Sequence, residues 1–254
     1  MPRTVELGEH RLTGIGLGTN RLTDTPENRS FLEAAVHTDL NFVDTAHLYA
    51  GGESEAVIGA TLAPFGDELV VATKGGYEAG IGIDGLRAEL ELSYERLQVD
   101  TITLYYLHRA HPDHPIEESM RLLQEYRDAG RITHIGLSAV GVEQIEEARS
   151  IVPIAAVQNA YNLSERDDEV VDHCAEEGIA FVAYYPLHGD DTPAVTEIAE
   201  RHGATPNQVK LAWLLKRSPA IVPIPGTLSV EHLKENLGAL DLELSDDEFE
   251  RLSA

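Results

Sequence analysis

The sequence predicts an α/β fold of the (β/α)8 barrel type, and three observations lead to it. Short apolar runs alternate with longer amphipathic stretches, and the pair of patterns recurs eight times along the chain. The apolar runs are rich in β-branched and aromatic residues, which is typical of strands buried on both faces. The length of 254 residues suits one large core. We therefore expect residues 1–254 to form a single domain built as a closed parallel sheet.

The repeats can be placed one by one. Strands are expected at residues 13–19, 40–45, 68–74 and 100–108, and helices at 27–39, 53–65, 83–98 and 115–130. The second half continues with strands at 131–138, 154–159, 179–186 and 220–226. The helices that follow them are expected at 142–151, 166–178, 192–203 together with 205–217, and 229–239. Thr192-Pro193 and Thr205-Pro206 have the pattern of an N-cap followed by a first-turn proline.

The two ends of the chain carry additional elements. Residues 4–13 have the pattern of a short β-hairpin turning at Gly8-Glu9, which we expect to close the floor of the barrel. Residues 242–254 are expected to end in a helix. Ser245 is its N-cap, and Glu248 completes a capping box.

The charge of the chain narrows its possible partners. The formal net charge is -25, from 44 acidic and 19 basic residues. Nucleic acids and membrane surfaces are disfavoured, because binding phosphate requires clustered basic residues. So many acidic side chains in one fold repel one another unless salt screens their charges. High salt does so effectively, because the Debye length is only roughly 3 Å at 1 M. We infer a salt-adapted source, with an acidic protein from ordinary salt as the alternative.

The sequence also predicts where the protein works. Cys174 is the only cysteine, so no disulfide framework or CxxC metal site is expected. Residues 1–10 lack the apolar centre of a signal peptide, and no apolar stretch is long enough to span a membrane. We expect a cytoplasmic protein that is a monomer or a small homo-oligomer.

Polar residues fall where the predicted strands end. The second, third and fourth strands end at Asp44, Lys74 and His108, and Tyr49 lies in the loop after the second strand. The carboxyl ends of barrel strands converge on one face, so these four side chains are expected to meet there. Each has an ordinary structural explanation alone, but four complementary groups at neighbouring strand ends favour a catalytic site.

These four residue types support proton transfer. An unperturbed tyrosine has a pKa near ~10, and a nearby ammonium group is expected to lower it. A carboxylate beside Lys74 keeps that lysine charged and in place. A neutral His108 can donate to a carbonyl oxygen and orient it toward Tyr49. The set is therefore suited to protonate an oxygen that gains negative charge, as a carbonyl does when it receives hydride.

The four residues and their surroundings, VDTAHLYAGG, VVATKGG and LYYLHR, resemble the catalytic tetrad of the aldo-keto reductase superfamily, over essentially the whole chain. The resemblance implies NAD(P)H-dependent reduction of an aldehyde or ketone, or the reverse oxidation, on a (β/α)8 barrel. It makes Tyr49 the proton donor and His108 the residue that orients the substrate. No Rossmann fingerprint is expected, and GIGLGTN does not form one.

The resemblance also implies the residues that bind the cofactor. Ser138 and Gln158 would hold the nicotinamide carboxamide, Tyr184 would stack on the ring, and the 225–236 segment would lie along the phosphates and the adenine. The complete expected set is Gly18, Thr19, Asn20, Asp44, Ser138, Gln158, Tyr184, Pro186, Leu187, Pro225, Gly226, Thr227, His232, Glu235 and Asn236.

Three positions depart from the family pattern. Ala139 stands where the family usually has asparagine, Gly226 where many members have lysine, and His232 where many have the arginine that binds the 2′-phosphate of NADP. NADP(H) is favoured as the cofactor, and NAD(H) remains possible. The stretches VQNAYN, AWLLKRSP and IPGT with HLKENL are most similar to the branch that includes bacterial pyridoxal reductases.

Other functions stay open at this point. Lys74 could form a Schiff base in a lyase or aldolase, and an inactive relative could bind the cofactor as a redox sensor. His111 and His114 raise the question of a metal site, but they lie in a proline-interrupted loop without thiolates, so we expect no metal. The identity of the small carbonyl or alcohol substrate does not follow from the sequence.

Overall fold

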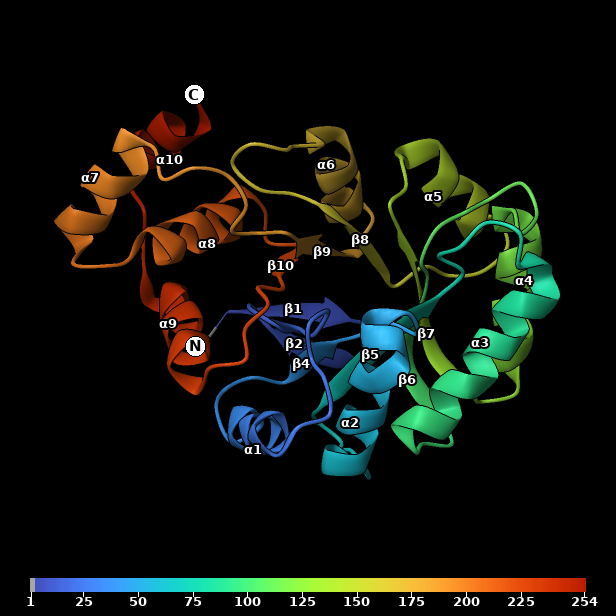
Figure 1. Ribbon diagram of the computed structural model, residues 1–254. Coiled ribbons are helices and arrows are strands. Elements are labelled where there is room, and N and C mark those ends of the chain that lie inside the picture. Colours follow the sequence, from blue (N-terminus) through green and yellow to red (C-terminus); the bar gives the residue numbers. More distant parts are fainter. Residues whose placement is uncertain (1–2) are drawn as a thin grey trace.

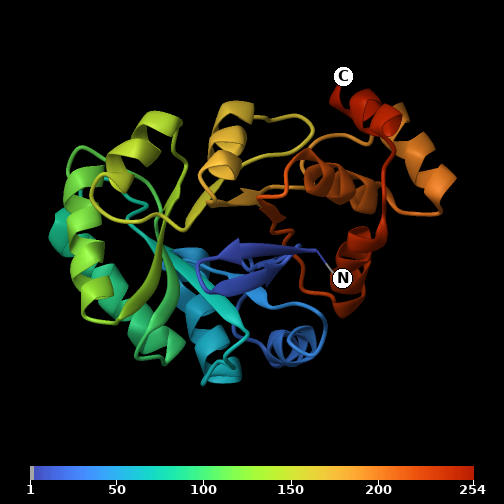
Figure 2. The same ribbon diagram turned by 180° about the vertical axis from the view of Figure 1, so that it is seen from behind.

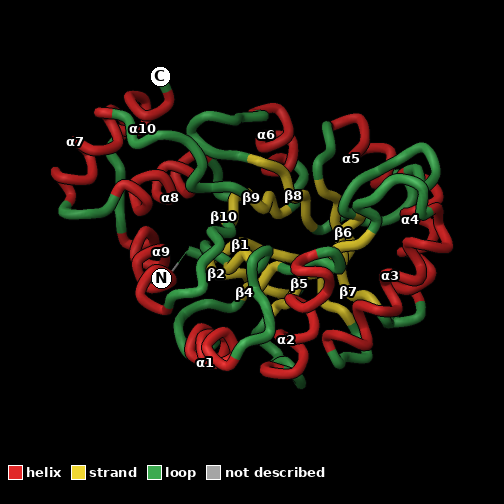
Figure 3. Tube along the Cα trace, in the orientation of Figure 1, coloured by secondary structure: helices red, strands yellow, loops and turns green. Residues whose placement is uncertain are grey.

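The computed structural model describes residues 3–254, and its centre is a parallel sheet rolled into a barrel (Figure 1). The tube in Figure 3 shows the strands inside and the helices around them. Neighbouring strands follow chain order from β3 to β10. They are β3 (Leu17–Gly18), β4 (Phe42–Asp44), β5 (Val70–Gly75), β6 (Ile102–Leu107), β7 (Ile132–Ser138), β8 (Ala156–Ala160), β9 (Ala180–Tyr184) and β10 (Ile221–Pro223).

The barrel closes between its first and last strands. Gly18 forms a parallel bridge with Gly226, and the Gly16 and Gly18 amides donate to the Pro223 and Pro225 carbonyls at 3.0 and 3.2 Å. Gly18 allows this approach, because a Cβ there would lie 2.8 Å from the Ile224 carbonyl oxygen. The predicted (β/α)8 architecture is confirmed.

Helices surround the barrel, as Figure 2 shows from behind. The predicted N-caps Thr192, Thr205 and Ser245 each accept a hydrogen bond from a first-turn amide, and Ser229 does the same at the start of α9. The helices are α1 (Pro26–Ala35), η1 (Tyr49–Gly52), α2 (Glu53–Leu62), α3 (Gly82–Leu97), α4 (Ile116–Asp128), α5 (Val142–Arg149), α6 (Asp168–Glu176), α7 (Pro193–His202), α8 (Pro206–Arg217), α9 (Val230–Leu237), η2 (Gly238–Asp241) and α10 (Asp246–Ser253).

The predicted N-terminal hairpin closes the amino end of the barrel. Its strands, β1 (Thr4–Leu7) and β2 (His10–Thr13), pair antiparallel around the turn at residues 8–9. Asn41, directly before β4, binds both the Thr13 amide and the Arg11 carbonyl, at 2.7 and 2.6 Å. The buried hairpin side chains pack against residues inside the barrel. The floor is therefore apolar and sealed.

Strand alternation separates two apolar cores. Phe42, Ala72, Tyr106, Ala156 and Val182 belong to the cluster inside the barrel. Their chain neighbours Val43, Val71, Tyr105, Val157 and Phe181 belong to the layer between the strands and the helices. Side chains two residues apart on a strand share a face. The residue two positions after each interior residue is therefore directed inward at the carboxyl end of its strand.

Two further observations concern the chain as a whole. Within residues 3–254, no helix is both long and apolar enough to cross a lipid bilayer. Cys174 is buried on α6.

A pair of histidines joins the hairpin to the barrel wall. His10 Nδ1 lies 3.1 Å from His134 Nε2, with the rings edge to face at 5.2 Å. Burial and then the neighbouring His10 lower the pKa of His134, against an opposing effect of Glu9. The native state therefore binds a proton at His134 less readily than the unfolded chain does.

We expect this contact to make folding sensitive to acid. As pH falls below about 6.5, the unfolded chain takes up a proton at this position that the native state resists, so the free energy of unfolding decreases. Denaturant titrations at about pH 7.5 and pH 5 measure how much the free energy of unfolding decreases between the two pH values. This decrease should be larger for the wild type than for His134→Gln. The exposed His37→Gln is the control and should keep the wild-type loss. Equal losses in all three proteins would rule the contact out as the cause.

Candidate active site

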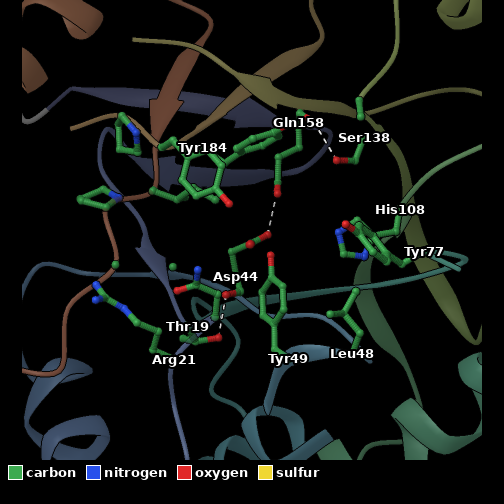
Figure 4. Close-up of a pocket in the computed structure, with 18 of the residues that line it drawn as sticks. Thr19, Arg21, Asp44, Leu48, Tyr49, Tyr77, His108, Ser138, Gln158 and Tyr184 are labelled. Carbon is green, nitrogen blue, oxygen red and sulfur yellow. Dashed lines mark hydrogen bonds between the residues drawn. The ribbon is translucent and has the colours of Figure 1, made fainter. Parts of the chain in front are cut away.

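A cavity of about 760 Å³ opens at the carboxyl ends of the strands (Figure 4). The structure brings most of the predicted site residues together in its wall. These are Gly18, Thr19, Asn20, Asp44, Tyr49, His108, Ser138, Gln158, Tyr184, Pro186, Leu187, Pro225 and Gly226.

A buried ion pair lies beneath the cavity. Lys74 Nζ is 2.6 Å from Asp44 Oδ1, and the exposed fractions of the two side chains are 0% and 1%. The ammonium also donates to the Thr45 carbonyl at 2.7 Å and to Tyr49 Oη at 3.4 Å. The second Asp44 oxygen accepts from Gln158 Nε2 at 2.7 Å. All three protons of the lysine and both carboxylate oxygens therefore have partners.

The ion pair keeps the lysine charged. Burial alone would lower the pKa of Lys74, but the Asp44 carboxylate and then Tyr49 outweigh burial and raise it. Burial raises the pKa of Asp44, while attraction to Lys74 and the bonds from Lys74 and Gln158 oppose that rise. Lys74 is therefore an ammonium at neutral pH.

Tyr49 presents its hydroxyl above this pair. The Lys74 nitrogen lies 4.9 Å from the centre of the tyrosine ring, and that ring meets His108 edge to face at 6.2 Å. Lys74 lowers the pKa of Tyr49, but burial has the larger effect, so the pKa is raised above 10.0. Lys74 therefore acts on the Tyr49 pKa in the expected direction, but the expected net lowering is wrong for this structure, because burial of the tyrosine has the larger effect. Tyr49 is a neutral phenol at neutral pH.

The loop that carries Tyr49 is clamped from the helix layer. Its backbone turns through left-handed conformations at Ala50, Gly51 and Gly52, with φ of 49°, 66° and 97°. Arg96 donates to the His47 carbonyl at 3.1 Å and to the buried Glu55 at 3.2 Å. A Cβ at Gly52 would lie 2.3 Å from the Arg96 guanidinium carbon.

His108 faces the cavity as a neutral ring. Burial, followed by the positive charges of Lys74 and Arg109, lowers the pKa of His108 to about 2. Tyr77 packs against the imidazole with ring centres 4.9 Å apart. The neutral His108 ring has one N–H that can donate a hydrogen bond and one nitrogen that can accept one.

Ser138 and Gln158 are linked at adjacent strand ends. Ser138 Oγ donates to the Gln158 carbonyl at 2.9 Å. Ala139 follows in a left-handed conformation with φ of 56°. Asparagine tolerates this conformation better than alanine does. Asn159 holds the turn through the Val140 amide and carbonyl, at 3.1 and 2.7 Å.

Two tyrosines stand at the end of β9. Tyr184 is half-buried, and Tyr185 is 59% exposed with a φ of 52°. Their rings meet edge to face at 5.1 Å. The pair places two roughly perpendicular aromatic rings at the mouth of the cavity.

The structure leaves some predicted residues outside the cavity wall. Lys74 lies below it, and Thr227, His232, Glu235 and Asn236 lie on α9 or directly before it. The Glu235 carboxylate accepts from the Thr205 hydroxyl at 2.7 Å, and Thr227 Oγ1 accepts from the Ser229 amide at 3.1 Å. Their roles at the phosphate and adenine end stay predictions.

Several cavity residues were not predicted from the sequence. They include Arg21, Leu48, Tyr77, Arg109, Tyr185 and His188. Each lies within a few residues of a predicted one. The search for site residues at the ends of the predicted strands would have found them if it had included the loop that follows each strand. Arg96 and Glu55 give no such signal, because their contact joins α3 to α2. Over residues 3–254, no group of three or more His, Cys, Asp or Glu side chains is placed to hold a metal ion.

The fold and the site together define a (β/α)8 barrel with acid–base groups gathered at its carboxyl end. The family model described as the aldo/keto reductase family matches residues 14–191 and 189–254. This chain belongs to the aldo/keto reductase family, as the sequence motifs indicated.

Individual relatives cover nearly the whole chain. Pyridoxine 4-dehydrogenase of Escherichia coli is 36% identical over an alignment of 272 positions, which covers 96% of this chain and 95% of that protein. An uncharacterised oxidoreductase of Schizosaccharomyces pombe is 34% identical over an alignment of 275 positions, which covers 98% of this chain and 88% of that protein.

Solved structures show the same fold. The thermostable aldo-keto reductase Tm1743, in complex with the inhibitor epalrestat, has a TM-score of 0.90 and 34% identity, covering 98% of both chains. The aldo-keto reductase of Klebsiella pneumoniae in complex with NADPH has a TM-score of 0.88 and 29% identity, covering 99% of this chain and 94% of the other.

We expect Asp44→Asn to be strongly destabilising. The change leaves the Lys74 ammonium buried without its counter-charge, which costs roughly 3–5 kcal/mol in comparable sites. Chemical denaturation should show this loss in the free energy of unfolding. Glu117→Gln is the matched control, because it breaks an exposed ion pair with Arg121 and should cost under about 1 kcal/mol. Similar losses in both variants would contradict the importance assigned to the buried pair.

Proposed function

We propose that this protein reduces the carbonyl group of an aldehyde or ketone with a nicotinamide cofactor, or runs the reverse oxidation, and that Tyr49 is its general acid. The observation that carries the proposal is the position of the Tyr49 hydroxyl. It lies 3.4 Å from the buried Lys74 ammonium and shares one cavity with the neutral His108. Membership of the aldo/keto reductase family supports the same reaction class.

The cavity fits a nicotinamide dinucleotide. The backbones of Gly18 and Gly226 meet at its edge, so no side chain from either obstructs a phosphate there. We infer that Thr19, Asn20 and Arg21 bind on this phosphate side. Gln158 already donates its amide to Asp44, which leaves its side-chain oxygen for the carboxamide group, and Tyr184 would stack on the ring. When bound, the cofactor supplies the hydride.

NADP(H) is the favoured cofactor. The similar Klebsiella pneumoniae structure contains NADPH, which supports the same choice here. His232 and Lys234 on α9 are the basic residues we assign to the 2′-phosphate in place of an arginine. Because a histidine binds less firmly than a bidentate arginine, some use of NAD(H) is expected.

Four residues have separate roles in the proposed proton transfer. The neutral His108 donates to the carbonyl oxygen and directs it toward Tyr49. Tyr49 then gives its hydroxyl proton to that oxygen as negative charge develops on it. The Lys74 ammonium stabilises the phenolate that remains, and Asp44 holds Lys74 in place through the 2.6 Å contact.

The structure disfavours a Schiff-base function for Lys74. An attacking amine must be neutral and reachable, whereas Lys74 is a buried ammonium with all three donors engaged. A cofactor-binding sensor without turnover would need no proton donor, so the intact acid–base set favours an enzyme. Activity measurements separate these two possibilities.

We expect Tyr49→Phe to abolish most turnover. Loss of the proton donor should reduce kcat for carbonyl reduction by about 10²–10⁴-fold, while NADPH binding changes little. Turnover is measured by nicotinamide absorbance against a panel of aldehydes, and binding by quenching of protein fluorescence.

The control is Tyr94→Phe, which removes a hydroxyl that bonds the Arg131 carbonyl outside the cavity. Full activity in Tyr49→Phe would contradict the proposed acid. NADPH binding without turnover in the wild type would favour the sensor. Trapping of Lys74 by borohydride with a carbonyl substrate would favour the Schiff-base enzyme.

We also expect an unusually flat pH profile. His108, with a pKa of about 2, stays neutral, and Tyr49, with a pKa above 10.0, stays protonated. The kcat/KM for reduction should therefore be constant between about pH 6.5 and 9 and should fall only as Tyr49 loses its proton at higher pH. Circular dichroism at each pH checks that the protein is folded. A titration near pH 7 that disappears in His108→Gln would contradict the neutral ring.

A further inference from the structure

Cations without an acidic partner are few in this acid-rich chain. Over residues 3–254, fourteen of the nineteen lysines and arginines lie within 4.0 Å of a carboxylate oxygen. The exceptions are Arg3, Arg21, Arg109, Arg166 and Lys234. Arg3 and Arg166 donate to backbone carbonyls instead. Arg21, Arg109 and Lys234 therefore have no ionic or hydrogen-bonding partner for their charged groups within this part of the chain.

Two of these three line the same cavity. Arg21 follows β3, which closes the barrel against β10, and Arg109 follows β6, which is three strands away from β3 in the sheet order. In Figure 4, Arg21 and His108 lie on opposite sides of Tyr49. Arg21 is therefore on the side assigned to the phosphates. Arg109, next to His108 in the chain, is on the side that we assign to the carbonyl substrate.

Arg109 is held at this position by its backbone and by an aromatic ring. Its amide donates to the Gly76 carbonyl at 3.1 Å. Its guanidinium carbon lies 4.6 Å from the centre of the Tyr77 ring, and the same ring contacts His108 at 4.9 Å. An arginine stacked on a tyrosine keeps its N–H edges available for hydrogen bonds. The guanidinium and the imidazole thus flank one aromatic ring.

We propose that Arg109 forms an anion subsite, so that the preferred substrates are carbonyl compounds that also carry a carboxylate or phosphate group. This inference rests on the proposed reductase function. A protein of charge -25 repels small anions, and an unpaired guanidinium at the substrate side provides local attraction against that background. The planar guanidinium matches both oxyanions by two parallel hydrogen bonds. The anionic group lies near Tyr77 while the carbonyl oxygen meets His108 and Tyr49.

Matched substrate pairs test the subsite. The kcat/KM of para-carboxybenzaldehyde is divided by that of the neutral para-formylbenzamide, in wild type and in Arg109→Gln, at a potassium chloride concentration where both are folded. Comparing the ratio between proteins cancels the intrinsic reactivity of the two aldehydes. We expect Arg109→Gln to reduce the ratio about tenfold, because each 1.4 kcal/mol of lost interaction is a factor of ten. Arg109→Lys should retain part of the preference, since it keeps the charge without the fork.

Two control variants separate the subsite from general charge effects. Arg121→Gln removes one positive charge from the exposed surface of α4 and should leave the ratio unchanged. Arg21→Gln should raise the KM for NADPH while the substrate ratio stays as in the wild type. A second pair, para-formylphenyl phosphate and para-methoxybenzaldehyde, shows whether phosphate or carboxylate is preferred.

A binding measurement distinguishes failure of the subsite from failure of the reductase function. Calorimetry compares para-hydroxymethylbenzoate with para-hydroxymethylbenzamide, each added to the protein with NADP⁺ present. Tighter binding of the benzoate that is lost in Arg109→Gln supports the subsite even if no aldehyde is turned over. Equal binding of the two compounds, or reduction of both aldehydes with an unchanged ratio in Arg109→Gln, overturns the subsite. In the second case the reductase function stands, and Arg109 only covers Tyr77.

Discussion

The ion pair between Asp44 and Lys74 is the interaction on which the site depends. Two charges so completely buried are stable only if every remaining donor and acceptor is satisfied. That requirement brings in the Gln158 amide from β8, the Thr45 carbonyl and the Tyr49 hydroxyl from the loop after β4. The pair therefore fixes the positions of three other groups around it. Any change that separates the two charges also displaces the proton donor and one of the groups assigned to the cofactor.

The barrel supplies this geometry through strand alternation. Phe42 and Ala72 fill the apolar interior, and the side chains two residues further on, Asp44 and Lys74, share the inward face at the open end. The hairpin seals the opposite end, so polar groups reach solvent only through the cavity. Gly136 completes the arrangement, because a Cβ there would lie 2.4 Å from the Tyr106 ring that supports the polar layer. The apolar floor and the polar mouth thus follow from one pattern.

Sequence patterns predicted what depends on local chemistry. The helix caps at Thr205 and Ser245 and the strand ends at Asp44 and His108 were recognisable, because each is specified by residues a few positions apart. The clamp of Arg96 on Glu55 was not, since it joins two helices by packing alone. The raised pKa of Tyr49 also escaped prediction, because it depends on how much solvent the finished cavity excludes. The closeness of Lys74 to Tyr49 was predictable from the sequence, but the extent to which Tyr49 is buried was not.

The acidity of the chain bears on how any anion reaches the site. At the high salt concentration for which the composition predicts adaptation, charges more than roughly 3–10 Å apart are largely screened, so long-range repulsion and long-range steering both weaken. Recognition of an anion then depends on contacts at hydrogen-bonding distance. Most lysines and arginines are paired with carboxylates, which leaves few for ligands, and the unpaired Arg21 and Arg109 both line the cavity. The acidic surface is therefore compatible with anion binding. What decides binding is the local position of Arg21 and Arg109 in the cavity, and not the net charge of the protein.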